Sequence, residues 1–135
     1  TIDLSAIFGA FMFGLFAIES TEMKQSIQTI TSTFNPSPEK PGLPRYENDD
    51  YRRTDDTVTG NYWFITTLWH AQYLLEVGDS AGAMAILSWV KSHALSTGML
   101  AEQINPKTSE TIAPAPLTWS HAEYVSTMLD SIERR

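Results

Sequence analysis

Five stretches of the sequence have a helical hydrophobic pattern, and the connections between them alternate between short and long. Apolar residues recur along these stretches at spacings of three and four, and no segment keeps a sustained period of two. The expected helices span about residues 3–18, 21–34, 62–77, 79–95 and 117–135. The pattern therefore predicts an all-α fold of about five antiparallel helices.

Residues with capping propensity support several of these boundaries. Asp3 is a candidate N-cap of the first helix, and Ser20 precedes the second. Gly78 is typical of the residue that follows a helix C-terminus, and Asp79 then caps the fourth helix. Only a couple of residues are expected between the first and second helices and between the third and fourth.

The two long connections carry more information about function than the short ones. They span about residues 35–61 and 98–116. Short connections join antiparallel neighbours, so every second connection falls at the same end of the helical stack. Unstructured loops longer than about 12–15 residues are uncommon in compact domains and are usually functional or disordered. Two such loops at one end predict a binding surface.

The run "LSAIFGAFMFGLFAI", residues 4–18, is apolar on all sides. It is shorter than the roughly 20 residues that a membrane crossing needs. It also lacks the positive flank and the small-residue cleavage site of a signal peptide. The expectation is a helix buried between other helices, in a chain that is a fragment of a larger fold.

Composition and charge exclude several classes of partner and site. The chain has 135 residues, 42% hydrophobic and 19% charged, which suits one globular domain. Its net charge of −7 argues against nucleic acid and anionic membranes as partners. There is no cysteine, and the three histidines, His70, His93 and His121, lack a second ligand at helical spacing, so no metal site is expected. A cytoplasmic location is the default expectation, although the residues leave the compartment open.

The long loops contain side chains suited to a neutral, polyhydroxylated ligand. The first loop contains "RYENDDY", which places Arg45 beside tyrosines and carboxylates, and is followed by "GNYWF". Charged groups can hydrogen-bond hydroxyls, and aromatic faces can cover C–H surfaces. Glu102 begins the second loop, where a carboxylate near Trp119 could act as a general base. The alternative is a pair of solvated polar loops in which Arg52 and Arg53 pair with neighbouring acids.

Taken together, "RYENDDY", "GNYWFITTLWHAQYLLEVGD", "GMLAEQINPKTSE" and "APLTWSHAEYV" resemble the C-terminal part of glycoside hydrolase family 15. This family contains glucoamylases, glucodextranases and some prokaryotic trehalases. The resemblance implies an (α/α)6 barrel, or toroid, of twelve helices. Residues 1–135 would supply the last five helices of that catalytic domain.

The resemblance also implies roles for individual residues. Glu102 in "AEQ" corresponds to the general base, which deprotonates the attacking water. The implied substrate-binding residues are Arg45, Tyr46, Asp49, Tyr51, Trp63 and Trp119. The sequence departs from many members at Tyr62 and at Glu47-Asn48, which puts the detailed geometry of the subsites in doubt. His121 and Glu123 are expected to serve helix packing or to support the site indirectly.

The implied reaction is inverting hydrolysis of an α-glucoside, meaning an α-glucan, an isomalto-oligosaccharide or trehalose, without a cofactor. The family's catalytic acid lies in a segment upstream of this chain, so the isolated chain is expected to bind sugar weakly and to turn over nothing. Exposed apolar faces should favour self-association or association with the missing N-terminal part. Two alternatives stay open: a catalytically inactive carbohydrate-binding remnant, and a helical interaction domain whose aromatic residues only form a core.

Overall fold

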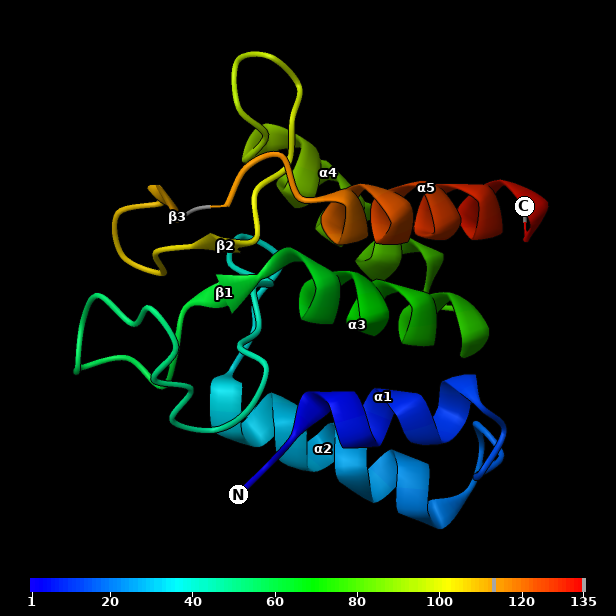
Figure 1. Cartoon of the computed structure of the whole chain (residues 1–135). Helices are drawn as coiled ribbons and strands as arrows, with labels where there is room; N and C mark the ends of the chain where they lie inside the picture. The colour runs from blue at the N-terminus through cyan, green and yellow to red at the C-terminus, as the bar shows by residue number, and fades with distance from the viewer. Residues whose placement is uncertain (113, 135) are drawn as a thin grey trace.

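The structure is a computed structural model that describes residues 1–112 and 114–134 (Figure 1). Its described residues form five α-helices: α1 Leu4–Met12, α2 Thr21–Phe34, α3 Phe64–Glu76, α4 Ser80–Ser92 and α5 Thr118–Glu133. They also form three two-residue strands: β1 Tyr62–Trp63, β2 Gln103–Ile104 and β3 Thr111–Ile112. The mainly helical fold confirms the prediction, but the small sheet was not predicted.

Helix α3 is the centre of the molecule and packs on both sides. Figure 1 shows it between the pair α1 and α2 and the pair α4 and α5. Its buried hydrophobic residues form two stripes at helical spacing. One stripe packs in a core with α4 and consists of Phe64, Leu68, Ala71 and Leu75. The other packs in a core with α1 and α2 and consists of Ile65, Trp69 and Tyr73.

The predicted caps of α2 and α4 are confirmed by hydrogen bonds. The Ser20 hydroxyl accepts from the Met23 N–H at 3.2 Å, and an Asp79 carboxylate oxygen accepts from the Gly82 N–H at 2.9 Å. Gly78, which follows α3, has a φ of +84°, a conformation that glycine adopts without steric cost. The turn between α3 and α4 is as short as predicted.

The expectation for the apolar run at residues 4–18 was wrong in two respects. Helix α1 ends at Met12 because Gly14 adopts a φ of +68°, so the first connection covers residues 13–20 and is longer than predicted. Only Leu4 and Phe8 of α1 are buried, whereas Phe13 is 91% exposed and Leu15 is 72% exposed. Apolar composition had predicted burial, but no described helix covers these side chains.

The sheet joins the two long connections at one end of the helices. Strand β2 lies between β1 and β3, and both pairs are antiparallel, with Trp63 opposite Gln103. This pairing explains why α3 begins at Phe64 rather than Tyr62. Lys107 of the second connection also forms an ion pair with Asp55 of the first at 2.6 Å. The predicted shared end of the long loops is therefore confirmed.

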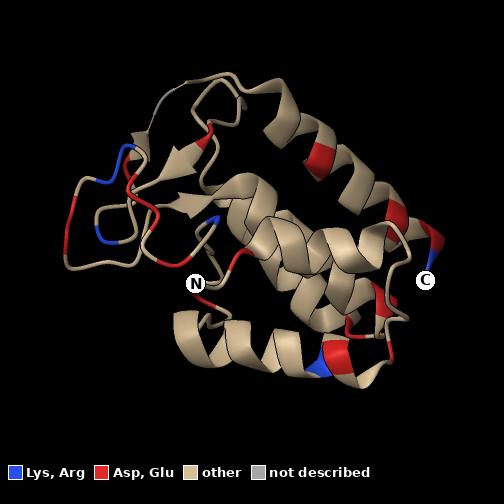
Figure 2. Cartoon of the chain, turned by 60° about the horizontal axis from the view of Figure 1, so that its bottom comes forward, with Lys and Arg blue, Asp and Glu red and all other residues tan. Residues whose placement is uncertain are grey.

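Charged residues of both signs gather on the loops beside this sheet, while the flanks of the central helices are mostly uncharged (Figure 2). None of the helices in the described part of the chain has the length and hydrophobicity to cross a membrane. The loops beside the sheet thus carry charges of both signs close together.

Candidate active site

A pocket of about 440 Å³ opens at the sheet end of the helices. Its lining includes six of the seven residues predicted from the sequence: Arg45, Tyr46, Tyr51, Trp63, Glu102 and Trp119. The first four come from the first long connection and β1, Glu102 comes from the second, and Trp119 comes from the first turn of α5. Side chains far apart in the sequence therefore line one pocket.

Glu102 is held in this pocket through its backbone, immediately before β2. Its N–H donates to the Pro114 carbonyl at 3.0 Å, and its carbonyl accepts from the Phe64 N–H at 3.4 Å. One carboxylate oxygen, Oε2, accepts from the Gln103 side-chain amide at 2.9 Å. The other oxygen has no hydrogen-bond partner among the described residues, so it is available to a ligand or a water molecule.

The amide that holds Glu102 belongs to a buried chain of hydrogen bonds. Gln103 is fully buried, and its Oε1 accepts from Asn61 Nδ2 at 2.8 Å. The same Asn61 nitrogen donates to the Arg52 carbonyl at 2.9 Å. Sequence reasoning missed Asn61, because nothing in the local pattern connects it to a residue 42 positions further along the chain. This chain of hydrogen bonds orients the Glu102 carboxylate through Gln103.

Arg45 reaches the pocket from a segment that pairs with the N-terminus. Its carbonyl accepts from the Leu4 N–H at 2.8 Å, which ties the loop to the start of α1. Its guanidinium donates through Nε and Nη2 to the two carboxylate oxygens of Asp49, both at 2.8 Å. Such bidentate pairs fix the geometry of an arginine, so Nη1 is the nitrogen that stays free of a described partner.

Asp49 has a different position from the one that the sequence predicted. It was expected at the sugar, but its side chain is only 1% exposed and does not line the pocket. Both of its oxygens are occupied by Arg45, and Oδ1 also accepts from the Tyr51 N–H at 3.1 Å. Asp49 therefore positions Arg45 and has no oxygen directed at a ligand.

The Arg45–Asp49 pair favours the charged forms of both groups. Hydrogen bonding to Asp49 raises the pKa of Arg45 above its usual value, and the nearby Glu102 contributes in the same direction. Burial opposes the ionisation of Asp49, but hydrogen bonds from Arg45 and from the Tyr51 backbone outweigh it and hold the pKa of Asp49 below its ordinary value. The pocket therefore keeps a fixed positive group beside the Glu102 carboxylate.

Aromatic rings form much of the remaining wall. The Arg45 guanidinium lies 4.1 Å from the ring centroid of Trp63 and 5.1 Å from that of Tyr51. Across the pocket, Trp119 is 48% exposed and its ring centroid lies 5.9 Å from that of Trp69. Trp69 of α3 is buried and also lines the pocket.

The expected supporting roles of His121 and Glu123 agree with their contacts. His121 Nε2 accepts from the Leu100 N–H at 3.0 Å and so joins α5 to the second long connection. Glu123 accepts from Trp119 Nε1 at 3.3 Å and from Gln72 Nε2 at 2.9 Å. Both side chains hold α5, and with it Trp119, in place.

A second carboxylate, Asp3, also lines the pocket and was predicted only as a helix cap. Its Oδ1 accepts from the Ser5 N–H, the Ser5 hydroxyl and the Ala6 N–H at 2.9, 2.6 and 3.3 Å. This oxygen is therefore committed to capping α1. Within the described residues, no group of three histidines or carboxylates could hold a metal ion.

Comparisons with known proteins relate the chain to glycoside hydrolases. The model of glycosyl hydrolases family 15 matches residues 78–129. An uncharacterized glycosyl hydrolase of Methanocaldococcus jannaschii is 28% identical over 93% of this chain and 21% of its own length. A glucoamylase of a Clostridium species (strain G0005) is 25% identical over 90% of this chain and 18% of its own length. The chain thus spans about a fifth of the length of these curated relatives.

The crystal structure of a bacterial glucoamylase complexed with acarbose superposes with a TM-score of 0.84, covering 98% of this chain and 20% of that one, at 24% identity. A chain described as a wild-type glycosidase superposes with a TM-score of 0.73 at 22% identity, covering 98% of this chain and 36% of its own. These superpositions show a shared fold. The family 15 model, which matches residues 78–129, and the two relatives show that this chain is similar to glycoside hydrolases.

Proposed function

We propose that residues 1–135 form the C-terminal part of the catalytic domain of an inverting glycoside hydrolase, in which Glu102 is the general base. The observation that carries the proposal is the shared pocket of Glu102, Arg45 and the aromatic residues Trp63 and Trp119. The proposed substrate is an α-glucoside, in line with the glucoamylase relative and with the glucoamylase that binds acarbose. Hydroxyl groups would meet Arg45, and the apolar faces of a sugar ring would meet the aromatic rings.

In this reaction Glu102 takes a proton from a water molecule whose oxygen attacks the anomeric carbon. A carboxylic acid on the opposite side of the sugar gives its proton to the glycosidic oxygen, and the bond from the anomeric carbon to that oxygen breaks. The two carboxyl groups of an inverting enzyme are roughly 6.5–9.5 Å apart, which leaves room for the water. Held by Gln103 through Oε2, Glu102 keeps Oε1 for the proton transfer.

The proton donor is expected to come from outside these residues. Both carboxylate oxygens of Asp49 are bonded to Arg45, and Asp3 caps α1 through Oδ1, so the proposal assigns the acid role to neither of them. We therefore expect the isolated chain to bind an α-glucoside weakly and to release no glucose from maltose, isomaltose or trehalose. Release of glucose by this chain alone, lost in Glu102→Gln, would contradict this part of the proposal.

Binding can be tested on the chain itself with acarbose and the four tryptophans as reporters. Three indoles, those of Trp63, Trp69 and Trp119, line the pocket, while Trp89 lies on α4, packs in the core and serves as an internal control. In NMR spectra of the labelled chain, acarbose should shift the resonances of the first three indoles and leave that of Trp89 unchanged. Shifts confined to Trp89, or none at millimolar acarbose, would count against a saccharide site.

A pair of exposed aromatic residues provides a matched control for the same titration. Trp119→Ala should weaken acarbose binding several-fold, since it removes a half-exposed indole from the pocket wall. Phe13→Ala removes an even more exposed ring outside the pocket and should leave binding unchanged.

Turnover is tested in a longer protein that contains these residues together with an upstream acid. There, Glu102→Gln should lower kcat by about 10²–10⁴-fold with little change in KM, as expected for loss of a general base. Glu110→Gln is the matched control, because Glu110 is an exposed glutamate of the same connection and does not line the pocket. Equal activity of both variants would remove Glu102 from the mechanism.

A further inference from the structure

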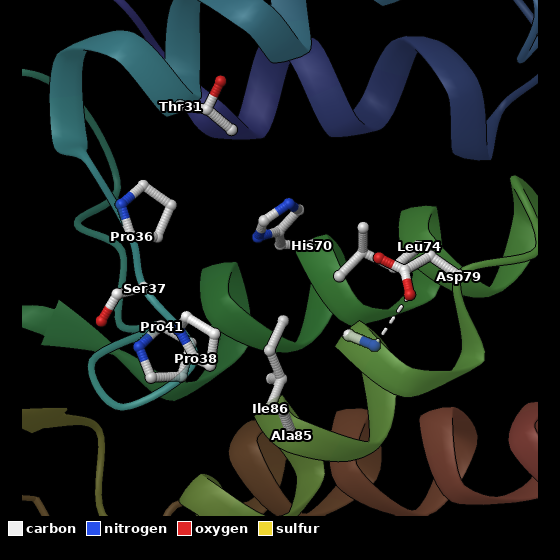
Figure 3. Close-up of a pocket in the computed structure, with 11 residues that line it drawn as sticks. Thr31, Pro36, Ser37, Pro38, Pro41, His70, Leu74, Asp79, Ala85 and Ile86 are labelled. Atoms are coloured by element: carbon white, nitrogen blue, oxygen red, sulfur yellow. Dashed lines mark hydrogen bonds between the residues drawn. The ribbon is translucent and has the colours of Figure 1, made fainter.

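A second pocket, of about 250 Å³, lies between α2, α3, α4 and the proline-rich start of the first long connection (Figure 3). It shares no lining residue with the pocket of Glu102. Its wall is largely apolar and includes Pro36, Pro41, Leu74 and Ile86. The proposed hydrolase activity does not use this pocket.

His70 projects from α3 into the middle of this pocket, between Pro36 and Leu74 in Figure 3. Its residue is only 7% exposed, and its Nδ1 is buried without a hydrogen-bond partner among the described residues. A buried polar atom that lacks a partner costs free energy, so native proteins rarely leave one unpaired. The arrangement calls for a hydrogen-bonding group inside the pocket.

The other polar groups of the lining are already bonded within the chain. Asp79 accepts from the Gly82 N–H at the start of α4, and the dashed line in Figure 3 marks this bond. The Thr31 hydroxyl donates to the carbonyls of Ile27 and Gln28 at 3.1 and 3.0 Å. The imidazole of His70 is therefore the polar group that most needs a partner from outside the chain.

We propose that this pocket binds a compact, mostly apolar ring molecule that carries one hydroxyl group and hydrogen-bonds to Nδ1 of His70. Phenol is the simplest molecule of this class. The size of the pocket agrees, because an apolar cavity of about 150 Å³ holds benzene in a well-studied engineered protein, and this pocket is larger.

A hydroxyl group suits this imidazole better than a charged group does. Burial lowers the pKa of His70 to about 4, so the ring is neutral near pH 7. A neutral imidazole offers a donor at one nitrogen and an acceptor at the other, and a hydroxyl group can complement Nδ1 in either tautomer. A carboxylate would lose its hydration in the apolar wall without gaining an opposite charge, because His70 is neutral and Asp79 of the lining is itself acidic.

The experiment titrates the chain, labelled with ¹⁵N at its three histidines, with phenol and with toluene. The two ligands match in size and differ in the hydroxyl group. Phenol should bind about tenfold more tightly, the advantage expected when a buried polar atom gains its partner. The imidazole nitrogens of His70 should shift on binding, while those of His93 and His121 should not. Equal affinities, or shifts at another histidine only, would overturn the proposal in favour of a water molecule at Nδ1.

Two variants separate pocket occupancy from the hydrogen bond. Ala85→Leu adds a side chain to the pocket wall and should weaken both ligands several-fold, whereas Ala81→Leu makes the same change at an exposed site of α4 outside the pocket and should weaken neither. His70→Phe should abolish the preference for phenol over toluene. If Ala85→Leu bound phenol as the unmodified chain does, the ligand would not occupy this pocket.

Discussion

The two ends of the helical stack differ in how their side chains are satisfied. At the sheet end, buried or half-buried charges have partners within the chain, as in the bidentate Arg45–Asp49 pair. At the opposite end, where the short turns lie (Figure 1), large apolar side chains face solvent. Phe13 is 91% exposed and Leu15 is 72% exposed, and Val77 in the turn after α3 is 38% exposed.

This difference separates a surface with a buried, paired charge from one with uncovered apolar side chains. The Arg45–Asp49 pair of the sheet end gains stability from hydrogen bonds within the described residues, while Arg53 Nε, Asn61 Oδ1 and Trp63 Nε1 are buried there without a described partner. Large exposed apolar patches instead mark contacts with another surface. Helix α5 continues the pattern, since Val125, Leu129 and Ile132 are each more than half exposed. A chain that is part of a larger helical barrel would expose such faces.

The largest expected effect is loss of the ion pair at the sheet end. Arg45→Met would leave Asp49 buried without its partner, and we expect a loss of about 3 kcal/mol in the free energy of unfolding at pH 7. Pairing holds the pKa of Asp49 below its ordinary value, so the contribution of Asp49 is present above that value and is lost as the pH falls. The difference between the two proteins, measured by urea unfolding, should therefore shrink in acid.

An exposed ion pair at the turn end supplies the control. Lys24 lies 2.8 Å from Glu19, but both side chains are more than half exposed. Lys24→Met should change the free energy of unfolding far less than Arg45→Met does, as is usual for surface pairs. Similar losses for both the arginine and the lysine variants would mean that burial does not distinguish the two ends.

His70 lies on α3 between the two ends. Its burial predicts a separate pH dependence of the free energy of unfolding. Its pKa is lowered to about 4 by burial, below the ordinary value of 6.5. The unfolded chain binds a proton as the pH falls below the ordinary value, while the folded chain does so only near pH 4. Stability is thus complete above about pH 6.5 and falls by up to about 3 kcal/mol as the pH approaches 4. Urea unfolding at pH 7 and pH 5 should show this slope, and His70→Phe should lack it.

A smaller effect is expected where α1 ends. Gly14 has a φ of +68°, so Gly14→Ala should cost about 1 kcal/mol in the free energy of unfolding. Gly9 lies within α1, and an added methyl group there would make only an ordinary contact with Phe13 at 3.9 Å. Gly9→Ala should therefore stabilise the chain by about 0.5–1 kcal/mol, as a glycine replaced inside a helix does. If Gly14 ends the helix by its conformation, thermal unfolding should show a lower melting temperature for Gly14→Ala and a higher one for Gly9→Ala.

Replacing the exposed apolar side chains that follow α1 should have the smallest effect on folding but a clear effect on self-association. The double variant Phe13→Ser and Leu15→Ser should change the free energy of unfolding by less than about 0.5 kcal/mol, because these side chains bury little. It should nevertheless reduce self-association in sedimentation and gel filtration. Met99→Ser, at a 43% exposed residue of the second long connection, is the control that should leave association unchanged. A stable monomer in the unmodified chain would contradict the prediction.

Periodicity and capping residues predicted the helices because these signals are local. The cap bonds of Ser20 and Asp79 lie within a few residues of their partners, and both appear as expected. The shared end of the long loops also followed from the sequence, since short turns force neighbouring helices to run antiparallel. The strands escaped prediction because each has two residues, too few for a period, and β1 pairs with β2 across a long stretch of intervening sequence.

The site residues also divide into those that a sequence motif identifies and those that only tertiary contacts identify. Motif resemblance led to Glu102 and Arg45, which line one pocket. The position of Asp49 differed because the bidentate geometry that occupies both of its oxygens exists only in the folded loop. Asn61 was missed because its hydrogen bond to Gln103 joins separate elements.

The amino-acid order alone thus determined the approximate positions of the helices, apart from the end of α1, how the chain reverses between them and which residue types meet at the loop end. Those properties depend on contacts within a few residues. Only the tertiary structure decided which carboxylate is free and which one is bonded to an arginine. It also decided which apolar surface stays uncovered. The reason is that burial and hydrogen-bond partnership depend on neighbours brought together by packing, and the sequence spacing of those neighbours carries no signal.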